Sequence, residues 1–346
     1  MIVARLPAAA YASPQAVQVI SQNMSWLPLS ISVMIGRSIL IQSNNAQNNK
    51  ELPAMPRLPK FVLIAVSVLM TAFTSSLATA QSIDLGRGEL PVTVPEGYSA
   101  GTPTPLIVLL HGYTSSGMVA DRYMGLSAIA DDYGFLLVAP NGTREPGGDQ
   151  NPYWNASDAC CNFFSTDVDD SGYLMSVIER MESEYNVDPK RIYLVGHSNG
   201  GFMSYRMAYE HSDKIAAIVS LAGANHLEQR PAPEHAVNIL QIHGTADQTI
   251  AYQGGEIQGN RYPSAMGSVQ RWASYNGCIT QGRAREQRDL DASLPGHETG
   301  VMTFDVGCRA GGAVALWTIS AGTHVPSVSD TYGAQLVEWL YDHPKP

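Results

Sequence analysis

The sequence feature that most constrains the fold is the run Gly196-His197-Ser198-Asn199-Gly200, which follows the mostly apolar residues 191–195 and precedes a helical pattern. This order predicts a strand, a tight turn with Ser198 at its tip, and a helix. A side chain at either flanking glycine would collide with the neighbouring backbone in such a turn. The turn presents the Ser198 hydroxyl at the edge of the sheet and places the N–H of Asn199 at a helix N-terminus, where negative charge is stabilised. The pattern therefore predicts a serine nucleophile.

Short apolar runs alternate with helical patterns along the rest of the chain. Unbroken apolar runs indicate strands buried on both faces, as in a parallel sheet covered by helices. We expect strands at 105–110, 135–139, 192–195, 216–221, 237–242 and 314–319, and helices at 118–133, 168–185, 201–211, 265–275 and 331–342. The connection between the strands ending at 221 and starting at 237 is too short for a cap domain. The sequence thus predicts one α/β domain over residues 81–346, with a mostly parallel central sheet flanked by helices and an open site.

The first eighty residues are expected to lie outside this domain. Residues 55–80 have a basic start, a short apolar core and an Ala-x-Ala end at Ala80, which is typical of a secretory signal peptide. A transmembrane anchor is the competing interpretation, but the apolar run is too short to span about 30 Å. Residues 1–54 resemble no folded element and are interpreted as an upstream extension. We expect a secreted or periplasmic protein, cleaved near Ala80 and without a membrane anchor.

The charge of the chain limits its partners. The full sequence has a net charge of −10; after residue 80, 16 basic and 30 acidic residues remain, a net charge of −14. Such a chain repels nucleic acid and anionic membranes and favours neutral substrates. We therefore expect a monomer that acts on an ester substrate, which can be polymeric, and that does not bind nucleic acid.

Four cysteines in an exported chain predict disulfides. Three pairings are open. Adjacent cysteines such as Cys160 and Cys161 rarely bond to each other, whereas Cys278 and Cys308 could close a loop of about thirty residues, worth roughly 3 kcal/mol. A zinc site is disfavoured because neither C-x-x-C nor paired histidine spacing is present.

A serine nucleophile needs a histidine base and a carboxylate that orients it, and in strand–turn–helix folds of this kind they follow in the order serine, acid, histidine. Asp247 lies just after the strand at 237–242, and His324 lies on a loop of small residues after the strand at 314–319. Asp291 and Asp305 are less well placed for the acid. We therefore predict a triad of Ser198, Asp247 and His324.

An oxyanion hole needs a second backbone N–H beside that of Asn199. The loop after the strand at 105–110 contains Gly112, whose lack of a side chain lets the backbone approach a substrate. We predict that Tyr113, or else Thr114, provides the second donor. The loop lacks the G-K-[ST] ending of a phosphate-binding loop.

The acidic cluster at 167–170 opens a predicted helix. Carboxylates at this position satisfy free N–H groups and the helix dipole, so we interpret Asp167, Asp169 and Asp170 together as stabilising the start of this helix. Calcium binding is the alternative, but no second group of ligands is spaced to complete such a site. No metal or cofactor is expected.

Taken together, these residues resemble the secreted esterases grouped as poly(3-hydroxybutyrate) depolymerase-like and feruloyl or acetylxylan esterases, over nearly all of residues 82–343. The shared motifs are Leu110-His111-Gly112-Tyr113, Trp154-Asn155 with Cys160-Cys161, Val168-Asp169-Asp170, the Ser198 turn, Asn276-Gly277-Cys278, and Leu316-Trp317 with Gly322-Thr323-His324-Val325-Pro326. The resemblance implies an α/β-hydrolase fold, the same triad and a bridge between Cys278 and Cys308. Thr323 and Val325 depart from the family pattern around the base, Gly-Gly-Gly-His followed by Trp-Pro.

The expected function is hydrolysis of carboxylic esters through an acyl-enzyme, with feruloyl or acetyl esters of plant polysaccharide as substrates. A polyhydroxybutyrate or other oligoester depolymerase is the alternative within this class; an acyltransferase and a non-catalytic polysaccharide binder are alternatives outside it. Substrate contacts are expected from five residues around the predicted nucleophile and the aromatic loop at 141–166: His111, Thr114, Tyr153, Trp154 and His197.

Overall fold

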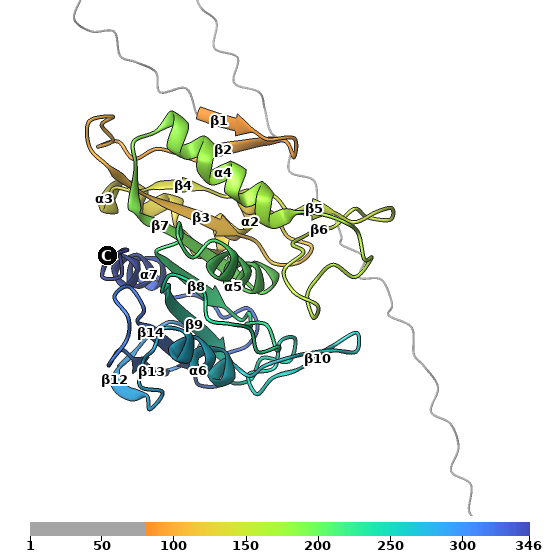
Figure 1. The fold of residues 1–346 in the computed structure, drawn as a ribbon, viewed down its shortest axis with the longest axis vertical. Coiled ribbons are helices and arrows are strands. Elements are labelled where there is room, and N and C mark those ends of the chain that lie inside the picture. Colours follow the sequence, from red (N-terminus) through yellow and green to blue (C-terminus); the bar gives the residue numbers. More distant parts are fainter. Residues whose placement is uncertain (1–80) are drawn as a thin grey trace, which may run out of the picture. The chain divides into compact units, whose positions relative to one another are not determined.

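The computed structural model describes residues 81–346, which form a ten-stranded sheet with helices on both faces (Figure 1). The strand order is β1-β2-β4-β3-β7-β8-β9-β14-β13-β12. The strands are β1 (Gln81–Asp84), β2 (Glu89–Thr93), β3 (Thr104–Leu110), β4 (Leu136–Val138), β7 (Val187–His197), β8 (Ala217–Leu221), β9 (Asn238–Gly244), β12 (Arg283–Arg288), β13 (Thr299–Phe304) and β14 (Val314–Ile319).

The six central strands, from β4 to β14 in the sheet order, pair in parallel, and antiparallel strands extend the sheet at both edges. The six parallel strands are the six apolar runs identified in the sequence. Nearly all of their residues are buried, as the unbroken apolar pattern predicts for strands covered on both faces. The predicted α/β class with a mostly parallel sheet is confirmed.

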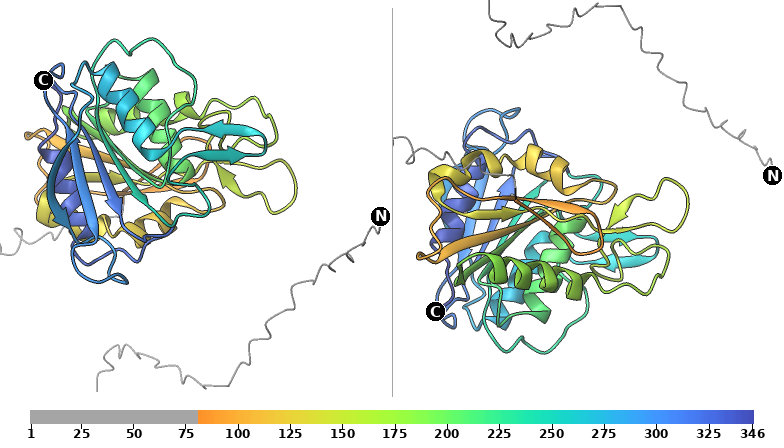
Figure 2. Two further views of the ribbon diagram at one scale, coloured as in Figure 1. Left: turned by 90° about the horizontal axis from the view of Figure 1, so that it is seen from below. Right: turned by 90° about the horizontal axis from the view of Figure 1, so that it is seen from above.

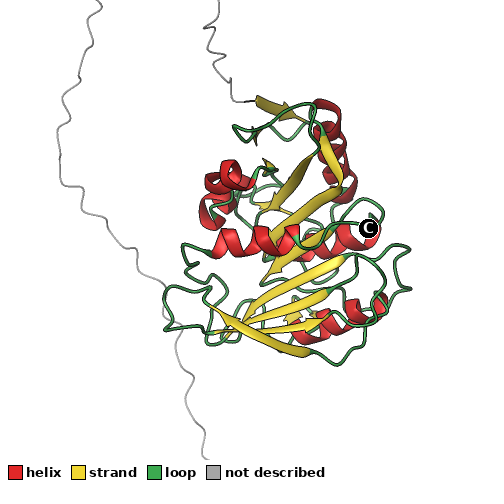
Figure 3. Cartoon of the chain, turned by 90° about the vertical axis from the view of Figure 1, so that its left-hand side faces the viewer, coloured by secondary structure: helices red, strands yellow, loops and turns green. Residues whose placement is uncertain are grey.

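Two layers of helices cover the sheet (Figures 2 and 3). Side chains of β3 alternate between the two layers. Leu106, Val108 and Leu110 pack in the cluster that contains α4, α5 and α6, while Ile107 and Leu109 pack in the cluster that contains α2, α3 and α7. The helices are α2 (Gly117–Met124), α3 (Ala130–Tyr133), α4 (Asp170–Glu184), α5 (Asn199–Glu210), α6 (Ala265–Tyr275) and α7 (Tyr332–Tyr341).

The structure differs from the sequence prediction in one helix and in the antiparallel edge strands β1, β2, β12 and β13, none of which was expected. The helix expected at 118–133 is broken, because Gly125 takes a left-handed conformation (φ 68°) that ends α2. Within the long connection expected at 280–300, β12 forms an edge strand whose polar residues gave no apolar signal.

Two hairpins project from the end of the sheet where the parallel strands terminate (Figure 1). One pairs β5 (Thr143–Arg144) with β6 (Pro152–Tyr153), and the other pairs β10 (Gly255–Ile257) with β11 (Asn260–Tyr262). The connection from β8 to β9 contains neither helix nor strand, so the expected absence of a cap at this point of the described chain is confirmed.

Within residues 81–346, none of the helices is both long and apolar enough to cross a membrane. The upstream extension at 1–54 and the signal peptide at 55–80 lie outside the described residues, and both stay predictions.

Candidate active site

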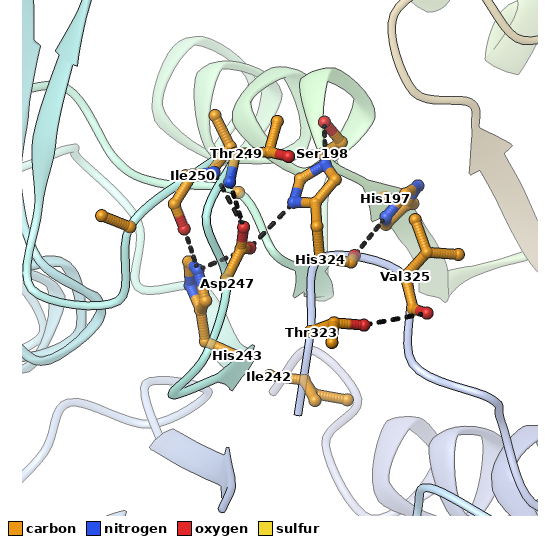
Figure 4. A network of polar contacts seen from close by, with 12 residues as sticks. His197, Ser198, Ile242, His243, Asp247, Thr249, Ile250, Thr323, His324 and Val325 are labelled. Atoms are coloured by element: carbon orange, nitrogen blue, oxygen red, sulfur yellow. Dashed lines mark hydrogen bonds and ion pairs between the residues drawn. The ribbon is translucent and has the colours of Figure 1, made fainter. Parts of the chain in front are cut away.

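Ser198 occupies the sharp turn between β7 and α5, with a positive φ of 54°. A Cβ atom on Gly196 would overlap the backbone of Gly200, and one on Gly200 would overlap the carbonyl of Leu110. The two glycines are therefore required by close backbone packing, as the sequence pattern predicted. The Ser198 side chain is directed toward the carboxyl ends of the strands, where the loops after β9 and β14 meet it (Figure 4).

The predicted acid and base lie within hydrogen-bond distance of the serine. His324 Nε2 is 2.9 Å from Ser198 Oγ, and His324 Nδ1 is 2.8 Å from Asp247 Oδ2 (Figure 4). The other predicted candidates for the acid are engaged elsewhere: Asp291 accepts hydrogen bonds from Ser293, and Asp305 pairs with Arg285.

The acid and base are brought together by neighbouring strands. β9 and β14 are parallel partners in the sheet, with Gly244 opposite Ile319 at their ends. Their loops then bond to each other, because the N–H of Ala246 donates to Gly322 O at 2.9 Å and the N–H of Ala321 donates to Thr245 Oγ1 at 2.8 Å. Residues 77 positions apart in sequence thus become adjacent.

Asp247 is held in the ionised form by its hydrogen bonds. Burial by itself would raise the pKa of this carboxyl, but bonds from His243 and His324 and from the N–H of Ile250 outweigh burial and lower the pKa well below its usual value. Its Oδ1 accepts the backbone N–H groups of Thr249 and Ile250 at 2.8 and 2.9 Å. This arrangement leaves Oδ2 charged and aimed at the histidine ring.

His243 is a member of this network that the sequence analysis did not assign. Its ring is buried, Nδ1 accepts from Gln241 Nε2 at 3.1 Å, and Nε2 donates to Ile250 O at 2.7 Å. The same Nε2 lies 3.2 Å from Asp247 Oδ2. The signal available in the sequence was its position, four residues before the acid at the end of the same strand.

His197 was expected to contact substrate, but the structure gives it a supporting position. Its Nε2 donates to the backbone oxygen of His324 at 2.9 Å, and the two rings lie 5.1 Å apart. Burial lowers the pKa of His197 to about 4, so the ring is neutral at physiological pH and is able to donate this single bond. This bond holds the loop that carries the base, and the contact of His197 with substrate stays a prediction.

The loop after β3 passes close to the nucleophile. A Cβ atom on Gly112 would lie 3.4 Å from the Cβ of Ser198, so glycine allows the closest approach here. The N–H of Thr114 is occupied by Pro152 O at 2.9 Å, which removes this residue from the possible oxyanion donors. The N–H of Tyr113 donates to no acceptor within residues 81–346, and that of Asn199 begins a helix and has no acceptor within it. Both N–H groups are therefore available.

The side chain of Asn199 fastens this loop region to the serine turn. Asn199 Oδ1 accepts from the N–H of Trp154 at 2.7 Å, and Asn199 Nδ2 donates to Trp154 O at 2.9 Å. Trp154 Nε1 then donates to His111 O at 3.0 Å, and His111 Nε2 accepts the N–H of Gly142 at 2.9 Å. The sequence analysis considered only the backbone of Asn199, and no local pattern marks its side chain as a connector.

Three predicted substrate contacts are corrected by their burial. His111, Tyr153 and Trp154 are all 0% exposed, and each has its polar atoms bonded inside the protein. Burial also lowers the pKa of His111 to about 4, which keeps the ring neutral. Their rings pack inside the protein and support the loops around Ser198. Thr114 is the exposed member of the predicted set at this edge, and its contact with substrate stays a prediction.

Tyr113 is anchored through its side chain. Its hydroxyl bonds to Glu145, and its ring packs edge-on against Phe163 with centroids 5.3 Å apart. Burial and the hydrogen bond to Glu145 raise the pKa of Tyr113 to about 12, so the hydroxyl remains a donor. This contact fixes the position of the backbone N–H without using it.

Both cysteine pairs are bonded. Cys278 and Cys308 form the disulfide that the resemblance implied, while Cys160 bonds to its neighbour Cys161, the pairing that sequence reasoning regarded as rare. Asp169 is the N-cap of α4, as predicted, and Asp170 binds Arg87. Within residues 81–346, no group of three or more histidine, cysteine or acidic side chains is placed to hold a metal ion.

Comparison with known proteins relates the chain to esterases. Feruloyl esterase B of Piromyces equi is 28% identical over 247 residues, which cover 67% of this chain and 42% of that protein. Poly(3-hydroxyalkanoate) depolymerase C of Paucimonas lemoignei is 30% identical over 176 residues, which cover 48% of this chain and 40% of that protein. The chain thus spans about two fifths of the length of these relatives.

A solved structure of the acetyl xylan esterase from Aspergillus awamori shares the fold, with a TM-score of 0.50 at 15% identity, over 75% of this chain and 98% of that one. Residues 98–286, which include β3, the serine turn, Asp247 and both projecting hairpins, match the family described as phospholipase/carboxylesterase. The chain therefore belongs to the phospholipase/carboxylesterase family and has the α/β-hydrolase fold.

Proposed function

We propose that this protein is a secreted serine esterase that hydrolyses carboxylic esters through an acyl-enzyme. The observation that carries the proposal is the continuous chain of hydrogen bonds from Ser198 Oγ through His324 to Asp247. A serine hydroxyl bonded to a histidine that is itself oriented by an ionised carboxylate is the arrangement that activates serine as a nucleophile.

In the proposed reaction, His324 Nε2 takes the proton of Ser198 as Oγ attacks the ester carbonyl carbon. The negative charge on the carbonyl oxygen is stabilised by the N–H groups of Tyr113 and Asn199, each donor being worth about 3 kcal/mol in the transition state. His324 then protonates the leaving alcohol. Water, deprotonated by the same histidine, attacks the acyl carbon and releases the acid and Ser198.

The substrates we propose are feruloyl or acetyl esters of plant polysaccharide. Support comes from the named relatives and from exposed apolar side chains near the base: Val325 is 54% exposed and follows His324 directly, and Met118 is 70% exposed on α2. The hydroxyl of Tyr123 on α2 donates to Pro326 O at 2.9 Å, which keeps these surfaces close. Such a surface suits an aromatic or polymer-borne ester.

A polyhydroxybutyrate or oligoester depolymerase is the second candidate, favoured by the relative from Paucimonas lemoignei. Export is supported by the two disulfides, which persist in oxidising compartments. We propose residues 81–346 as the catalytic domain.

The decisive experiment compares the protein with its Ser198→Ala variant on methyl ferulate, acetylated xylan, a short-chain p-nitrophenyl ester and hydroxybutyrate oligomers. We expect the variant to lose at least about 10⁴-fold in kcat on every substrate that the protein hydrolyses. Ser176→Ala, at an exposed serine of α4, is the matched control and should retain full activity. Activity that survives in Ser198→Ala rejects the mechanism.

The same assays separate the alternatives from other classes. An acyltransferase would form a new ester when an acceptor alcohol is added, and chromatography of the products detects it. A polysaccharide binder would retain xylan in a pull-down after Ser198→Ala and would hydrolyse nothing. The esterase is expected to release free acid in water with and without the alcohol.

A further inference from the structure

A cavity of about 250 Å³ lies beside α5 and is lined by none of the triad residues. Three segments enclose it, each connected to the loops around the serine turn: 157–159 from the loop after β6, 225–230 from the loop after β8, and 259–262 from the hairpin of β10 and β11. The hairpin projects from the same end of the sheet as the serine turn (Figure 1). The cavity therefore lies near the end of the sheet at which the proposed reaction takes place.

The position of the cavity relative to Ser198 follows from contacts along α5. The ring of Tyr262, in the cavity wall, packs edge-on against Phe202 at 6.0 Å. One turn further on, Arg206 Nη1 donates to Asn155 O at 2.5 Å, two residues before the 157–159 segment. At 1.5 Å per residue, Arg206 lies about 12 Å along the helix from Ser198. The cavity wall therefore contacts α5 four residues beyond the nucleophile.

Two arginines in the cavity wall have no carboxylate partner within residues 81–346. Arg230 lies over the ring of Tyr209, with its guanidinium carbon 5.4 Å from the ring centroid, and Arg261 is exposed on the hairpin. Asp158 and Glu228 also line the cavity, and Glu256 is opposite Arg261 on the hairpin, but none of their oxygens is within 4.0 Å of either guanidinium. Both guanidinium groups remain available to bind an anion in two-point fashion.

A third arginine, Arg271, holds the backbone of the 225–230 segment by hydrogen bonds. Arg271 Nη1 donates to the carbonyl oxygens of His226 and Leu227 at 2.7 and 2.6 Å, so its charge is not neutralised by an acid. His226 Nε2 is buried and has no hydrogen-bond partner in the described chain. Burial and the nearby arginines lower the pKa of His226 to about 4, so its neutral ring adds one polar atom without a partner to the cavity wall.

We propose that this cavity, which we call the arginine subsite, binds a carboxylate carried by the ester substrate at a distance from the bond that is cleaved. The inference rests on the proposed esterase function and specifies its substrate class. The overall charge of −14 after residue 80 would repel an acidic substrate, and uncompensated arginines at this position offset that repulsion locally. The carboxylate can belong to a uronic acid branch of a polysaccharide or to the free acid end of an oligoester.

The test uses two pairs of substrates that differ only in the acid. One pair is an acetylated xylo-oligosaccharide with and without a glucuronic acid branch, and the other is a hydroxybutyrate trimer as the free acid and as its methyl ester. In the pair that contains the natural source of the carboxylate, we expect the acidic member to have a KM about tenfold lower than the neutral member, at equal kcat. Arg261→Gln should remove this advantage and leave kinetics on the neutral member unchanged.

Arg230→Gln should act in the same direction, whereas Arg283→Gln, at an exposed arginine of β12 on the far edge of the sheet, should change neither pair. Binding of the unacetylated oligosaccharides and of the trimers to the Ser198→Ala variant, measured by calorimetry, gives the same comparison without catalysis. A missing preference for the acidic member in both pairs, or an Arg261→Gln effect equal on acidic and neutral members, overturns the subsite. Hydrolysis of the neutral esters by the unmodified protein tests the esterase proposal separately.

Discussion

The two sides of Ser198 are built by different physical means. On the base side, Asp247 and His324 come from the ends of adjacent strands and are joined by charged hydrogen bonds. On the oxyanion side, Trp154 and His111 are buried and neutral, and Asn199 connects them to the serine turn through paired bonds to the backbone. The base side contains the side chains that transfer protons, whereas the side chains of the oxyanion side only fix the position of the backbone N–H donors.

Substitutions on the two sides should therefore reduce kcat by different amounts. Damage to the base side removes a charge that the transition state needs, so it should affect kcat directly. A side-chain substitution on the oxyanion side keeps the backbone N–H donor but no longer fixes its position. The loss in kcat should therefore be smaller and should depend on how far the loop moves.

The largest effect is expected from Asp247→Asn. The amide would remove the negative charge beside His324 Nδ1, so the imidazolium that forms during the reaction would lose its stabilisation. We expect kcat on a p-nitrophenyl ester to fall by about 10⁴-fold, measured at a pH and temperature at which the variant is folded. A loss below tenfold in a folded variant would show that Asp247 does not orient the base.

A smaller loss is expected from Asn199→Ala, which keeps the backbone N–H but releases both bonds to Trp154. We expect kcat to fall by about 10²-fold and KM to change little, because the position of a donor in the transition state is disturbed. Trp154→Phe, which removes the bond to His111 O and part of the buried ring but keeps both backbone bonds to Asn199, is the graded control and should lose less. Equal losses in kcat for Asn199→Ala and Asp247→Asn would contradict the comparison.

His243→Gln should cost about tenfold in kcat, since Asp247 would keep its bonds from His324, Thr249 and Ile250 while losing one neighbour. The informative measurement is the pH–rate profile: a positioning residue should shift its acid limb, and a purely structural one should lower the whole curve. An unchanged rate and profile would remove His243 from the proposed site.

Acid should destabilise the oxyanion side at pH values at which Asp247 is still ionised. His111 has its pKa lowered from 6.5 to about 4, so the unfolded chain binds a proton that the folded one does not, and stability falls as pH drops through this window. Asp247 has a lowered pKa too, so its contribution is lost only at pH values below its usual value of 3.8.

The measurement is urea unfolding at pH 7.5 and pH 4.5. His111→Gln should reduce the acid-induced loss in the free energy of unfolding by about 2 kcal/mol, whereas His297→Gln, at an exposed position, should leave it unchanged. His197 and His226 shift in the same direction, so part of the loss should remain in the variant. The same loss in His111→Gln as in the unmodified protein would contradict this assignment.

The sequence predicted the six parallel strands, the serine turn and the order of serine, acid and base well. These features have local signals: a strand buried on both faces is apolar at every position, and the turn around Ser198 requires glycine on both sides. The geometry of Asp247 and His324 agrees with the predicted triad, and their catalytic roles stay predictions that kinetics must test.

Other features left no readable local signal. β12 is an edge strand of polar residues, so it lacks the apolar alternation that marks a strand. Trp154 looks the same in the sequence whether it faces a ligand or the core, and only its burial shows that it supports the loop. Likewise, the pairing of Cys160 with Cys161 followed from no spacing rule.

By itself, then, the sequence determined where the chain turns and which chemistry it presents, because glycine requirements and continuous apolar runs act over a few residues. Only the tertiary structure decided which polar groups are available. Asn199 and Trp154 make bonds to residues far away in the sequence, and the free guanidinium groups of Arg230 and Arg261 depend on where the carboxylates of other segments lie. Burial and partner choice are properties of packing, which no local pattern specifies.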